Sequence, residues 1–243
     1  MFIKVLGSSS RGNCYILKGQ NDSLILECGV NPKLIKMFLG KEFVSTSGCL
    51  ISHEHSDHAK YATDMLENCI DIYSSAGTLK ALNLTDYRVN TLAQKEWNDI
   101  NAFKVYPFDT IHDCSEPNGY IIYHPELEGY LLFATDTKKI PYNFSVKFKH
   151  IFIECNYSEN LLFENIRTGQ VPEFIAKRTM NTHMSIDECL RYIKSLDLSQ
   201  TQTVTLIHLS NDNSSPEEFK EVFQKEFNNI KIEIASENKI IDL

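Results

Sequence analysis

The sequence predicts an α/β fold in which two β-sheets pack face to face with helices outside. In the first half, short apolar runs are separated by turn residues. In the second half, runs typical of strands are followed by segments typical of amphipathic helices. Strands followed by helices, twice along the chain, indicate two layered sheets. Hydrophobic residues make up 42% of the 243 residues, which is enough for a sizeable core.

The first half is predicted to contain strands with intervening helices. Apolar runs predict strands at residues 2–6, 14–18, 23–28, 48–52 and 70–73. Helices are expected at residues 32–39, 57–66 and 75–82. The first of these has Asn31 as its N-cap and Pro32 at its first position, where a missing N–H costs nothing.

The second half repeats this order. Strands are predicted at residues 119–123, 130–134, 151–154, 204–208, 231–235 and 239–243. Helices are predicted at residues 185–196 and 216–227, the first with apolar residues at helical spacing. Since the chain has no repeat, low-complexity tract or linker, we expect a single domain over residues 1–243.

Composition argues against several classes of protein, although the acidic charge is only a weak argument against nucleic acid because bound cations would cancel part of it. The net charge of -8 is unfavourable for nonspecific binding to a polyanion. The seven cysteines are scattered and contain no Cys-x-x-Cys pair, which argues against a disulfide framework or a cysteine-type zinc site. No apolar run is long enough to cross a membrane, and the N-terminus reads as a strand rather than a signal peptide. We therefore expect a cytoplasmic protein that does not bind a membrane.

The segment that follows the predicted strand at 48–52 is rich in metal-ligand side chains. It contains His53, His55, Asp57 and His58 within six residues. Neutral imidazole and carboxylate are the ligands that Zn²⁺ and similar ions prefer. The alternative is a solvated loop that is rich in histidine by chance.

Three further residues of the same kind favour the metal site over that alternative. His112 follows the run at residues 103–111, which is a further strand candidate, Asp136 follows the predicted strand at 130–134, and His208 ends the predicted strand at 204–208. Polar residues at strand ends meet at one edge of a sheet, where functional groups are commonly exposed. The pattern therefore predicts a cage of histidine and aspartate side chains.

This pattern resembles the metallo-β-lactamase superfamily. Shorter motifs resemble its YycJ/WalJ-like branch, which includes bacterial and phage-encoded proteins. These motifs are Gly7-Ser8-Ser9-Ser10-Arg11-Gly12-Asn13, His112-Asp113 with Pro117-x-Gly119-Tyr120, Thr135-Asp136-Thr137, Glu154-x-Asn156, His183-x-Ser185 and His208-Leu209-Ser210-x-x-Asn213. The resemblance implies a four-layer αββα sandwich of the metallo-β-lactamase type, with the site at one rim.

The resemblance also implies a site with two metal ions. One ion would be held by His53, His55 and His112, the other by Asp57, His58 and His208, with Asp136 bridging them. Zn²⁺ is the first expectation because five of the seven ligands are imidazoles, and Mn²⁺ or Fe is the alternative. Two such ions would activate a bridging hydroxide for hydrolysis. Because this hydroxide would be lost without the ion that Asp57 holds, Asp57 is expected to be catalytic as well as a metal ligand.

His183 is the candidate general acid, because the resemblance places it at the rim of the same site. The structural alternative is a polar residue beside Ser185, the expected N-cap of the next helix. His124 and His150 have no partners in the sequence, and we expect both at the surface.

Four residues are candidates for substrate binding at the rim: Asn13, Lys138, Asn156 and Asn213. The alternatives are turn or cap asparagines and a solvated lysine. Three positions depart from the usual pattern of the branch. Glu27 replaces an aspartate that would orient a ligand, Lys138 replaces a glycine, and Tyr157 replaces a histidine.

The expected function is hydrolysis of a phosphodiester in DNA or an oligonucleotide, as in an exonuclease. The alternative within the same chemistry is a phosphodiesterase for small cyclic nucleotides, including a phage-encoded enzyme directed against a nucleotide signal of host defence. The acidic charge and the short chain favour the smaller substrate, whereas the resemblance favours DNA. A different class is a metal-stabilised binding protein without turnover. Nucleic acid or nucleotide is the expected partner, and a second copy of the chain is a candidate partner.

Overall fold

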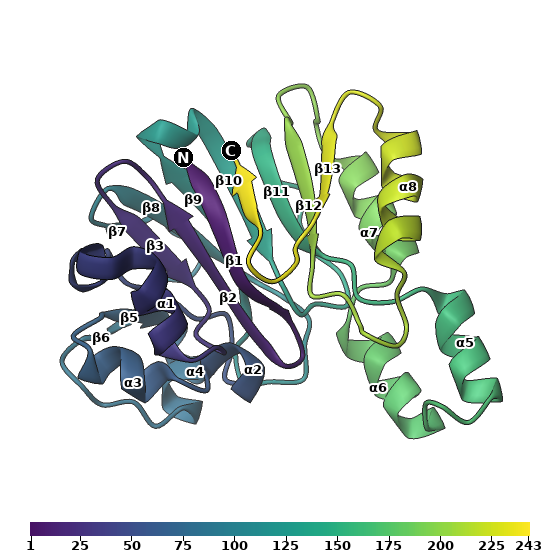
Figure 1. The fold of residues 1–243 in the computed structure, drawn as a ribbon, viewed down its shortest axis with the longest axis horizontal. Coiled ribbons are helices and arrows are strands. Elements are labelled where there is room, and N and C mark those ends of the chain that lie inside the picture. The colour runs from purple at the N-terminus through teal and green to yellow at the C-terminus, as the bar shows by residue number, and fades with distance from the viewer.

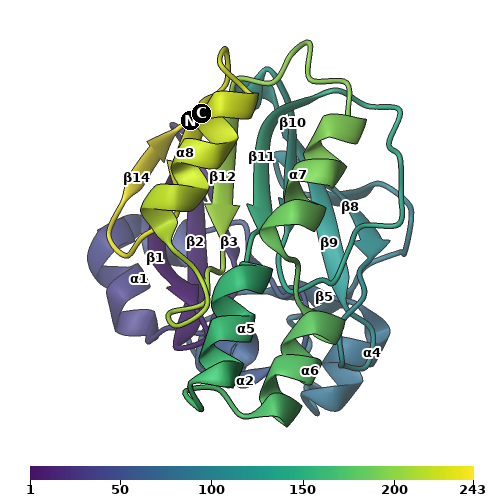
Figure 2. The ribbon, with the colours of Figure 1, turned by 90° about the vertical axis from the view of Figure 1, so that its right-hand side faces the viewer.

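The computed structural model describes residues 1–243 and contains two seven-stranded sheets. The sheets pack face to face, and helices cover the outer face of each (Figure 1, Figure 2). This arrangement confirms the predicted four-layer α/β sandwich. None of its helices has the length and apolar character needed to span a membrane.

The first sheet is built almost entirely from the first half of the chain. Its strands, in spatial order, are β14 (Ile240–Asp242), β1 (Phe2–Ser9), β2 (Gly12–Lys18), β3 (Ser23–Leu26), β4 (Cys49–Leu50), β5 (Ile72–Ser74) and β6 (Val89–Thr91). The strands from β14 to β3 pair antiparallel, and those from β3 to β6 pair parallel. Because β1 pairs with β14, the two ends of the chain lie side by side.

The second sheet has the same mixed organisation. Its strands, in spatial order, are β13 (Lys231–Ile234), β12 (Thr203–Ile207), β11 (Phe148–Glu154), β10 (Gly129–Ala134), β9 (Asn118–His124), β8 (Phe103–Asp109) and β7 (Asn98–Ile100). Strands β7 to β10 pair antiparallel, and β10 to β13 pair parallel.

The helices are divided between the two sheets. On the side of the first sheet lie α1 (Pro32–Leu39), the 3-10 helix η1 (Gly40–Ser45), α2 (Ser56–Ala59), α3 (Ala62–Glu67) and α4 (Ala76–Ala81). On the second sheet lie α7 (Ile186–Ser195) and α8 (Pro216–Glu226), while the 3-10 helix η2 (Pro125–Leu127) joins β9 to β10. Asn31 caps α1 as predicted, because its side chain accepts a hydrogen bond from the Lys33 N–H.

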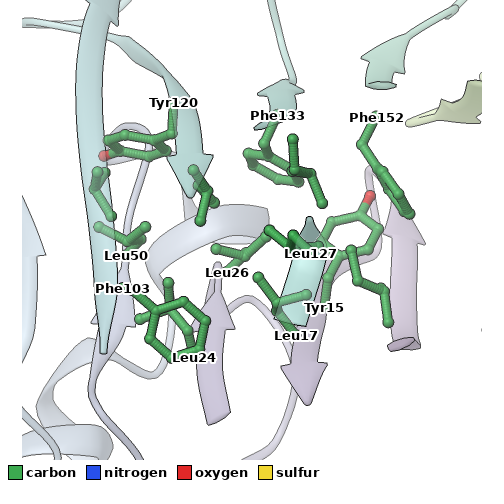
Figure 3. Packing of buried hydrophobic residues seen from close by; sticks show 14 of the residues in the cluster. Tyr15, Leu17, Leu24, Leu26, Leu50, Phe103, Tyr120, Leu127, Phe133 and Phe152 are labelled. Atoms are coloured by element: carbon green, nitrogen blue, oxygen red, sulfur yellow. The ribbon is translucent and has the colours of Figure 1, made fainter. Parts of the chain in front are cut away.

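Three hydrophobic clusters hold these layers together. The cluster between the sheets contains large side chains from both (Figure 3), including Tyr15 and Leu26 of the first and Phe133 and Phe152 of the second. A second cluster packs α1 and α3 against the first sheet, and a third packs α7 and α8 against the second. The two sheets therefore form a rigid support for the loops at their ends.

The structure differs from the sequence prediction in a few elements. The helix expected at 57–66 is two helices, α2 and α3, because Tyr61 between them donates its N–H to the Cys28 carbonyl at 3.1 Å. The short strands β6 and β7 were not predicted. Nor were α5 (Glu159–Arg167) and α6 (Glu173–Thr182), whose apolar residues form only a small cluster of their own. These two helices form a hairpin that extends beyond the ends of the strands (Figure 1).

Most of the candidate site residues lie at the carboxyl ends of parallel strands, whereas His112 follows the antiparallel strand β8. β4 leads into the histidine-rich segment, β10 into Asp136, and β12 into His208. β11 ends at Glu154. In open α/β sheets, the carboxyl ends of the strands form the usual site for ligands.

Candidate metal centre

The histidine-rich segment is held in place by hydrogen bonds just before it begins. Ile51 accepts hydrogen bonds at its carbonyl from Ser74 Oγ and Tyr120 Oη, both at 2.6 Å. Ser52 Oγ then lies 2.8 Å from His53 Nδ1. Since Nδ1 is engaged, His53 presents its other ring nitrogen, Nε2, to the site.

The first group of candidate ligands is made of three imidazoles. Ligand nitrogens of His53, His55 and His112 all lie within 4.8 Å of one another. His55 Nδ1 is 3.2 Å from His53 Nε2 and 3.1 Å from His112 Nε2. His112 Nδ1 donates to the Thr182 carbonyl at 2.8 Å, so its Nε2 is left with a lone pair. This is the second hydrogen bond that usually orients a metal-binding histidine.

The second group contains two imidazoles and two carboxylates. Candidate ligand atoms of Asp57, His58, Asp136 and His208 lie within 4.8 Å of one another. Asp57 Oδ2 lies 3.3 Å from His58 Nε2 and 3.5 Å from His208 Nε2. The seven side chains singled out in the sequence are thus brought together in two adjacent groups.

Asp136 stands between the two groups. Its Oδ2 lies 3.9 Å from His53 Nε2 and 3.6 Å from His112 Nε2. Its Oδ1 lies 3.3 Å from His58 Nε2 and 2.9 Å from His208 Nδ1. One carboxylate therefore directs one oxygen to each group. Asp136 adopts a left-handed backbone conformation with φ of 33°, which is uncommon for a residue other than glycine.

The electrostatics of the first group suit cation binding. Burial lowers the pKa of His53 well below its ordinary value, and the nearby His58 lowers it further. Burial also lowers the pKa of His112. Both imidazoles are therefore neutral near pH 7, which is the form that binds a metal.

In the second group, the buried Asp136 carboxylate determines the direction of the pKa shifts of the histidines. Burial raises the pKa of Asp136, but the His208 and His58 imidazoles outweigh it, and the net pKa lies well below its usual range. Conversely, burial lowers the pKa of His58 and His208, but Asp136 outweighs burial and raises both well above the usual value. Without a metal, protons balance the carboxylates, and a bound cation would replace those protons.

Two buried residues contact the ring nitrogens of His58, one at Nδ1 and the other at Nε2. Glu27 Oε2 lies 3.6 Å from His58 Nδ1, and both Glu27 oxygens accept from the Ser52 N–H. Asn13 Nδ2 lies 3.0 Å from His58 Nε2 and 3.4 Å from Asp57 Oδ2. Both Glu27 and Asn13 are completely buried. Glu27 therefore lies where an orienting carboxylate is expected, and Asn13 lies beside two of the candidate ligands without any exposed surface of its own.

Glu154 is the residue that sequence reasoning missed. It appeared only as part of a motif, without a role, although a carboxylate at the end of an apolar strand was a usable signal. Its Oε1 accepts from His183 Nδ1 at 2.6 Å and lies 3.1 Å from His208 Nδ1. Its Oε2 accepts from the Thr137 and Met184 N–H groups at 2.7 and 3.1 Å. Because these contacts occupy both oxygens, Glu154 positions its neighbours.

A cavity of about 370 Å³ opens above the two groups. Its wall includes Ile175, Arg178 and Thr179 of α6, together with His183, Asn156 and Asn213. Arg178 forms a two-pronged ion pair with Asp113, at 2.7 and 3.1 Å, which joins the α5–α6 hairpin to the residue after His112.

The remaining candidate substrate residues lie at different depths. Asn156 is buried and donates to the His208 carbonyl at 2.9 Å, and Asn213 accepts from Asn165 Nδ2 at 2.8 Å. Lys138 is exposed outside this cavity and donates to Asn181 Oδ1 at 3.1 Å.

The expectation that His124 and His150 lie at the surface was wrong, since both are buried. His124 has Asp22 and Glu126 nearby, and the three could be taken for a metal site. However, its Nδ1 accepts from the Glu126 N–H at 3.1 Å, and its Nε2 faces Asp22 Oδ2 at 3.1 Å. Both ring nitrogens are therefore used within the protein.

The residues of the two groups fit divalent metal ions. His208 Nε2 is buried without a hydrogen-bond partner, which is costly unless another group satisfies it. Imidazole and carboxylate together are the donor set of zinc and related metals. The histidine and aspartate cluster is therefore compatible with divalent metal binding.

Comparisons with known proteins agree with this picture, although no family model matches the sequence. The chain is 25% identical over 232 residues to the exodeoxyribonuclease YycJ of Bacillus anthracis, covering 89% of this chain and 85% of that protein. It is 24% identical over 230 residues to the exodeoxyribonuclease WalJ of Streptococcus pneumoniae, covering 88% and 83%.

Among solved structures, YhfI of Bacillus subtilis, a metallo-β-lactamase fold protein, superimposes with a TM-score of 0.74 at 16% identity, covering 99% of both chains. Together with the geometry above, these similarities confirm the resemblance seen in the motifs: the chain has the metallo-β-lactamase fold and is similar over most of its length to the proteins named YycJ and WalJ.

Proposed function

We propose that this chain is a metal-dependent phosphodiesterase that cleaves DNA or oligonucleotides. The observation that carries the proposal is the Asp136 carboxylate, which directs one oxygen to each of two adjacent groups of ligand side chains. Both relatives from bacteria are named exodeoxyribonucleases, which favours a polynucleotide substrate.

We infer that His53, His55 and His112 hold one ion, that Asp57, His58 and His208 hold the other, and that Asp136 bridges them. Zn²⁺ is the preferred ion because imidazoles dominate the set, with Mn²⁺ or Fe as alternatives. Two divalent ions bound there would supply Lewis acidity toward a phosphate and make water a better nucleophile.

The protein's own residues would position the substrate and move a proton. His183 lies on the wall of the site cavity with Nδ1 held by Glu154, so its other ring nitrogen is the one available to the leaving oxygen. Asn156 and Asn213 lie on the same wall and would contact the substrate. Asp57 would complete the second group of ligands together with His58 and His208.

The experiment is turnover of bis(p-nitrophenyl) phosphate by protein loaded with Zn²⁺ or Mn²⁺, before and after chelation. We expect turnover that chelation abolishes and metal restores. A protein that binds metal but never turns this ester over would instead be a metal-stabilised binding protein. A labelled panel of single- and double-stranded DNA, RNA and cyclic mono- and dinucleotides then separates the exonuclease from the cyclic-nucleotide phosphodiesterase.

A further inference from the structure

Three cavities adjoin one another along the rim, and the cavity of the metal centre is the middle one. The first flanking cavity, of about 480 Å³, shares Leu209 and Ser210 with the middle cavity. The other, of about 320 Å³, shares His183 with it. All three have volumes suited to a small ligand. A bound molecule can therefore extend from the metal centre past Leu209 and Ser210 into one flanking cavity and past His183 into the other.

The first flanking cavity, which we call the serine cavity, is lined by hydroxyl groups and lysines. Its polar residues include Ser8, Ser9, Ser210 and Ser214. Ser8 Oγ accepts from the His208 N–H at 2.9 Å, so the cavity begins directly beside the second ligand group. Lys220 of α8 also lines it. Hydroxyl groups and a lysine are typical partners of a nucleotide sugar and phosphate.

The charges of the serine cavity favour an anion. Lys239 is engaged with Glu233 at 2.6 Å, whereas Lys220 forms no salt bridge within the chain. Glu217 is the single carboxylate of the lining. The Lys220 ammonium group is therefore the cation available to the sugar and phosphate oxygens of a substrate in this cavity.

The cavity on the far side of His183, which we call the lysine cavity, has a mixed lining. It contains Lys138, Lys139 and Arg191, but also three carboxylates. Arg191 is paired with Glu188, and Lys139 forms no salt bridge. Such a balanced polar lining suits a nucleoside with a single phosphate better than a run of phosphates.

We propose that a linear polynucleotide strand lies across the metal centre from the serine cavity to the lysine cavity. The nucleotide that keeps the scissile phosphoryl group lies in the serine cavity, and the leaving nucleoside lies in the lysine cavity. This inference rests on the proposed function and adds to it the form of the substrate and its direction across the site.

The direction follows from the position of His183. The oxygen of water forms the new bond to phosphorus as the bond from phosphorus to the leaving oxygen breaks. His183 donates its proton to the leaving oxygen, and the proton that the attacking water releases to solvent restores the protonated His183. Because the His183 side chain forms the wall shared with the lysine cavity, the leaving oxygen lies on that side. A cyclic mononucleotide has no second nucleoside and would leave the lysine cavity empty.

Three kinds of substrate separate the two flanking cavities. Bis(p-nitrophenyl) phosphate has no nucleoside. The p-nitrophenyl esters of thymidine 3′- and 5′-phosphate have one nucleoside on the retained side, and assaying both makes the result independent of strand polarity. Short single-stranded oligodeoxynucleotides fill both sides. The first two substrates share the nitrophenolate leaving group, so we expect kcat/KM to rise at least about tenfold from the first to the second, as one good polar contact allows. The oligonucleotide has a more basic leaving oxygen, so the second cavity is tested by its KM, which we expect to be at least about tenfold below that of the thymidine ester.

Two charge reversals then test each cavity separately. Lys220→Glu should raise KM about tenfold for the preferred thymidine ester and for the oligonucleotide, relative to bis(p-nitrophenyl) phosphate. Lys139→Glu should raise KM for the oligonucleotide alone, relative to both nitrophenyl substrates. Lys225→Glu is the matched control, because Lys225 is an exposed lysine of α8 that lines neither cavity.

Each outcome is decisive. Absence of turnover of every substrate contradicts the proposed function. If the nucleoside does not improve kcat/KM, the proposed strand path is wrong. It is also wrong if Lys220→Glu and Lys139→Glu change KM no more than the control Lys225→Glu does. An effect of Lys139→Glu on the thymidine ester, with none of Lys220→Glu, reverses the direction and overturns the assignment of the two cavities.

Discussion

Glu154 holds His183 by a hydrogen bond of 2.6 Å between its Oε1 and the imidazole Nδ1. The same oxygen lies 3.1 Å from Nδ1 of His208, so one buried carboxylate fixes the separation between the proposed acid and a proposed metal ligand. A rigid contact of this kind costs no reorganisation during a reaction.

The loss of activity caused by His183→Ala should depend on the leaving group of the substrate. Nitrophenolate leaves readily without a proton, whereas a deoxyribose alkoxide is far more basic and needs one. We expect the loss of kcat on an oligonucleotide to exceed the loss on bis(p-nitrophenyl) phosphate by about a hundredfold or more. Metal content, measured by elemental analysis, should not change. Equal losses on the two substrates would indicate that His183 binds phosphate instead.

Glu154→Gln should weaken metal binding as well as turnover. In the glutamine, an NH₂ group that donates can take the place of Oε1, which accepts from His183 and lies next to His208. Both imidazoles would then lose the acceptor that fixes their orientation. Loss of such a supporting group typically costs about tenfold to a hundredfold in metal affinity. Competition with a metal chelator measures this, with the exposed Glu237→Gln as control. A variant with wild-type affinity would show that Glu154 does not support the metal centre.

The protein should bind two equivalents of divalent metal. The two groups of ligand side chains are separate, and Asp136 has an oxygen for each. Elemental analysis after reconstitution and removal of free metal should therefore give more than one equivalent per chain. A stoichiometry of one would rule out the two-metal mechanism while leaving the fold unaffected.

Asp57→Ala should give a folded protein with little activity. Asp57 belongs to the second group only and is not part of a hydrophobic cluster, so the packing of the sheets should persist. We expect a circular dichroism spectrum close to that of wild type and a loss of phosphodiester turnover of about a hundredfold or more. Turnover at the wild-type rate would show that the assignment of Asp57 is wrong.

His150 should make the free energy of unfolding depend on pH. Burial lowers its pKa to about 4, and its Nδ1 lies 2.8 Å from Thr203 Oγ1, near the start of the strand that ends at Glu154. The unfolded imidazole titrates near 6.5, so its contribution is complete above about pH 6.5 and is lost as the pH falls toward 4. The free energy of unfolding of wild type should therefore fall between pH 7.5 and pH 5 by on the order of 1–2 kcal/mol more than that of His150→Asn.

Urea unfolding of wild type and His150→Asn at both pH values tests this prediction. The difference in unfolding free energy between the two proteins should change sign or shrink as the pH falls. A difference that is the same at pH 7.5 and pH 5 would show that His150 titrates normally in the folded chain.

Features that depend on nearby residues were accessible from the sequence. The histidine-rich segment follows strand β4 directly, so its ligand side chains are grouped by the chain itself. Asp136 and His208 follow apolar strands, and parallel strands end at a common rim. Alternation of apolar and turn residues was likewise sufficient for the two-sheet sandwich, since most of its strands are buried on regular faces.

Other features depend on contacts between distant segments, and no local pattern encodes them. Glu154 supports His183 and His208, which are 29 and 54 residues away. Arg178 reaches Asp113 across 65 residues, and His150 is buried because β11 lies between β10 and β12. The identity and spacing of side chains along the strands determined the chemistry available at the rim. Only the packing of the sheets and the α5–α6 hairpin decided which of those side chains meet, because burial and orientation depend on the partners that folding brings together.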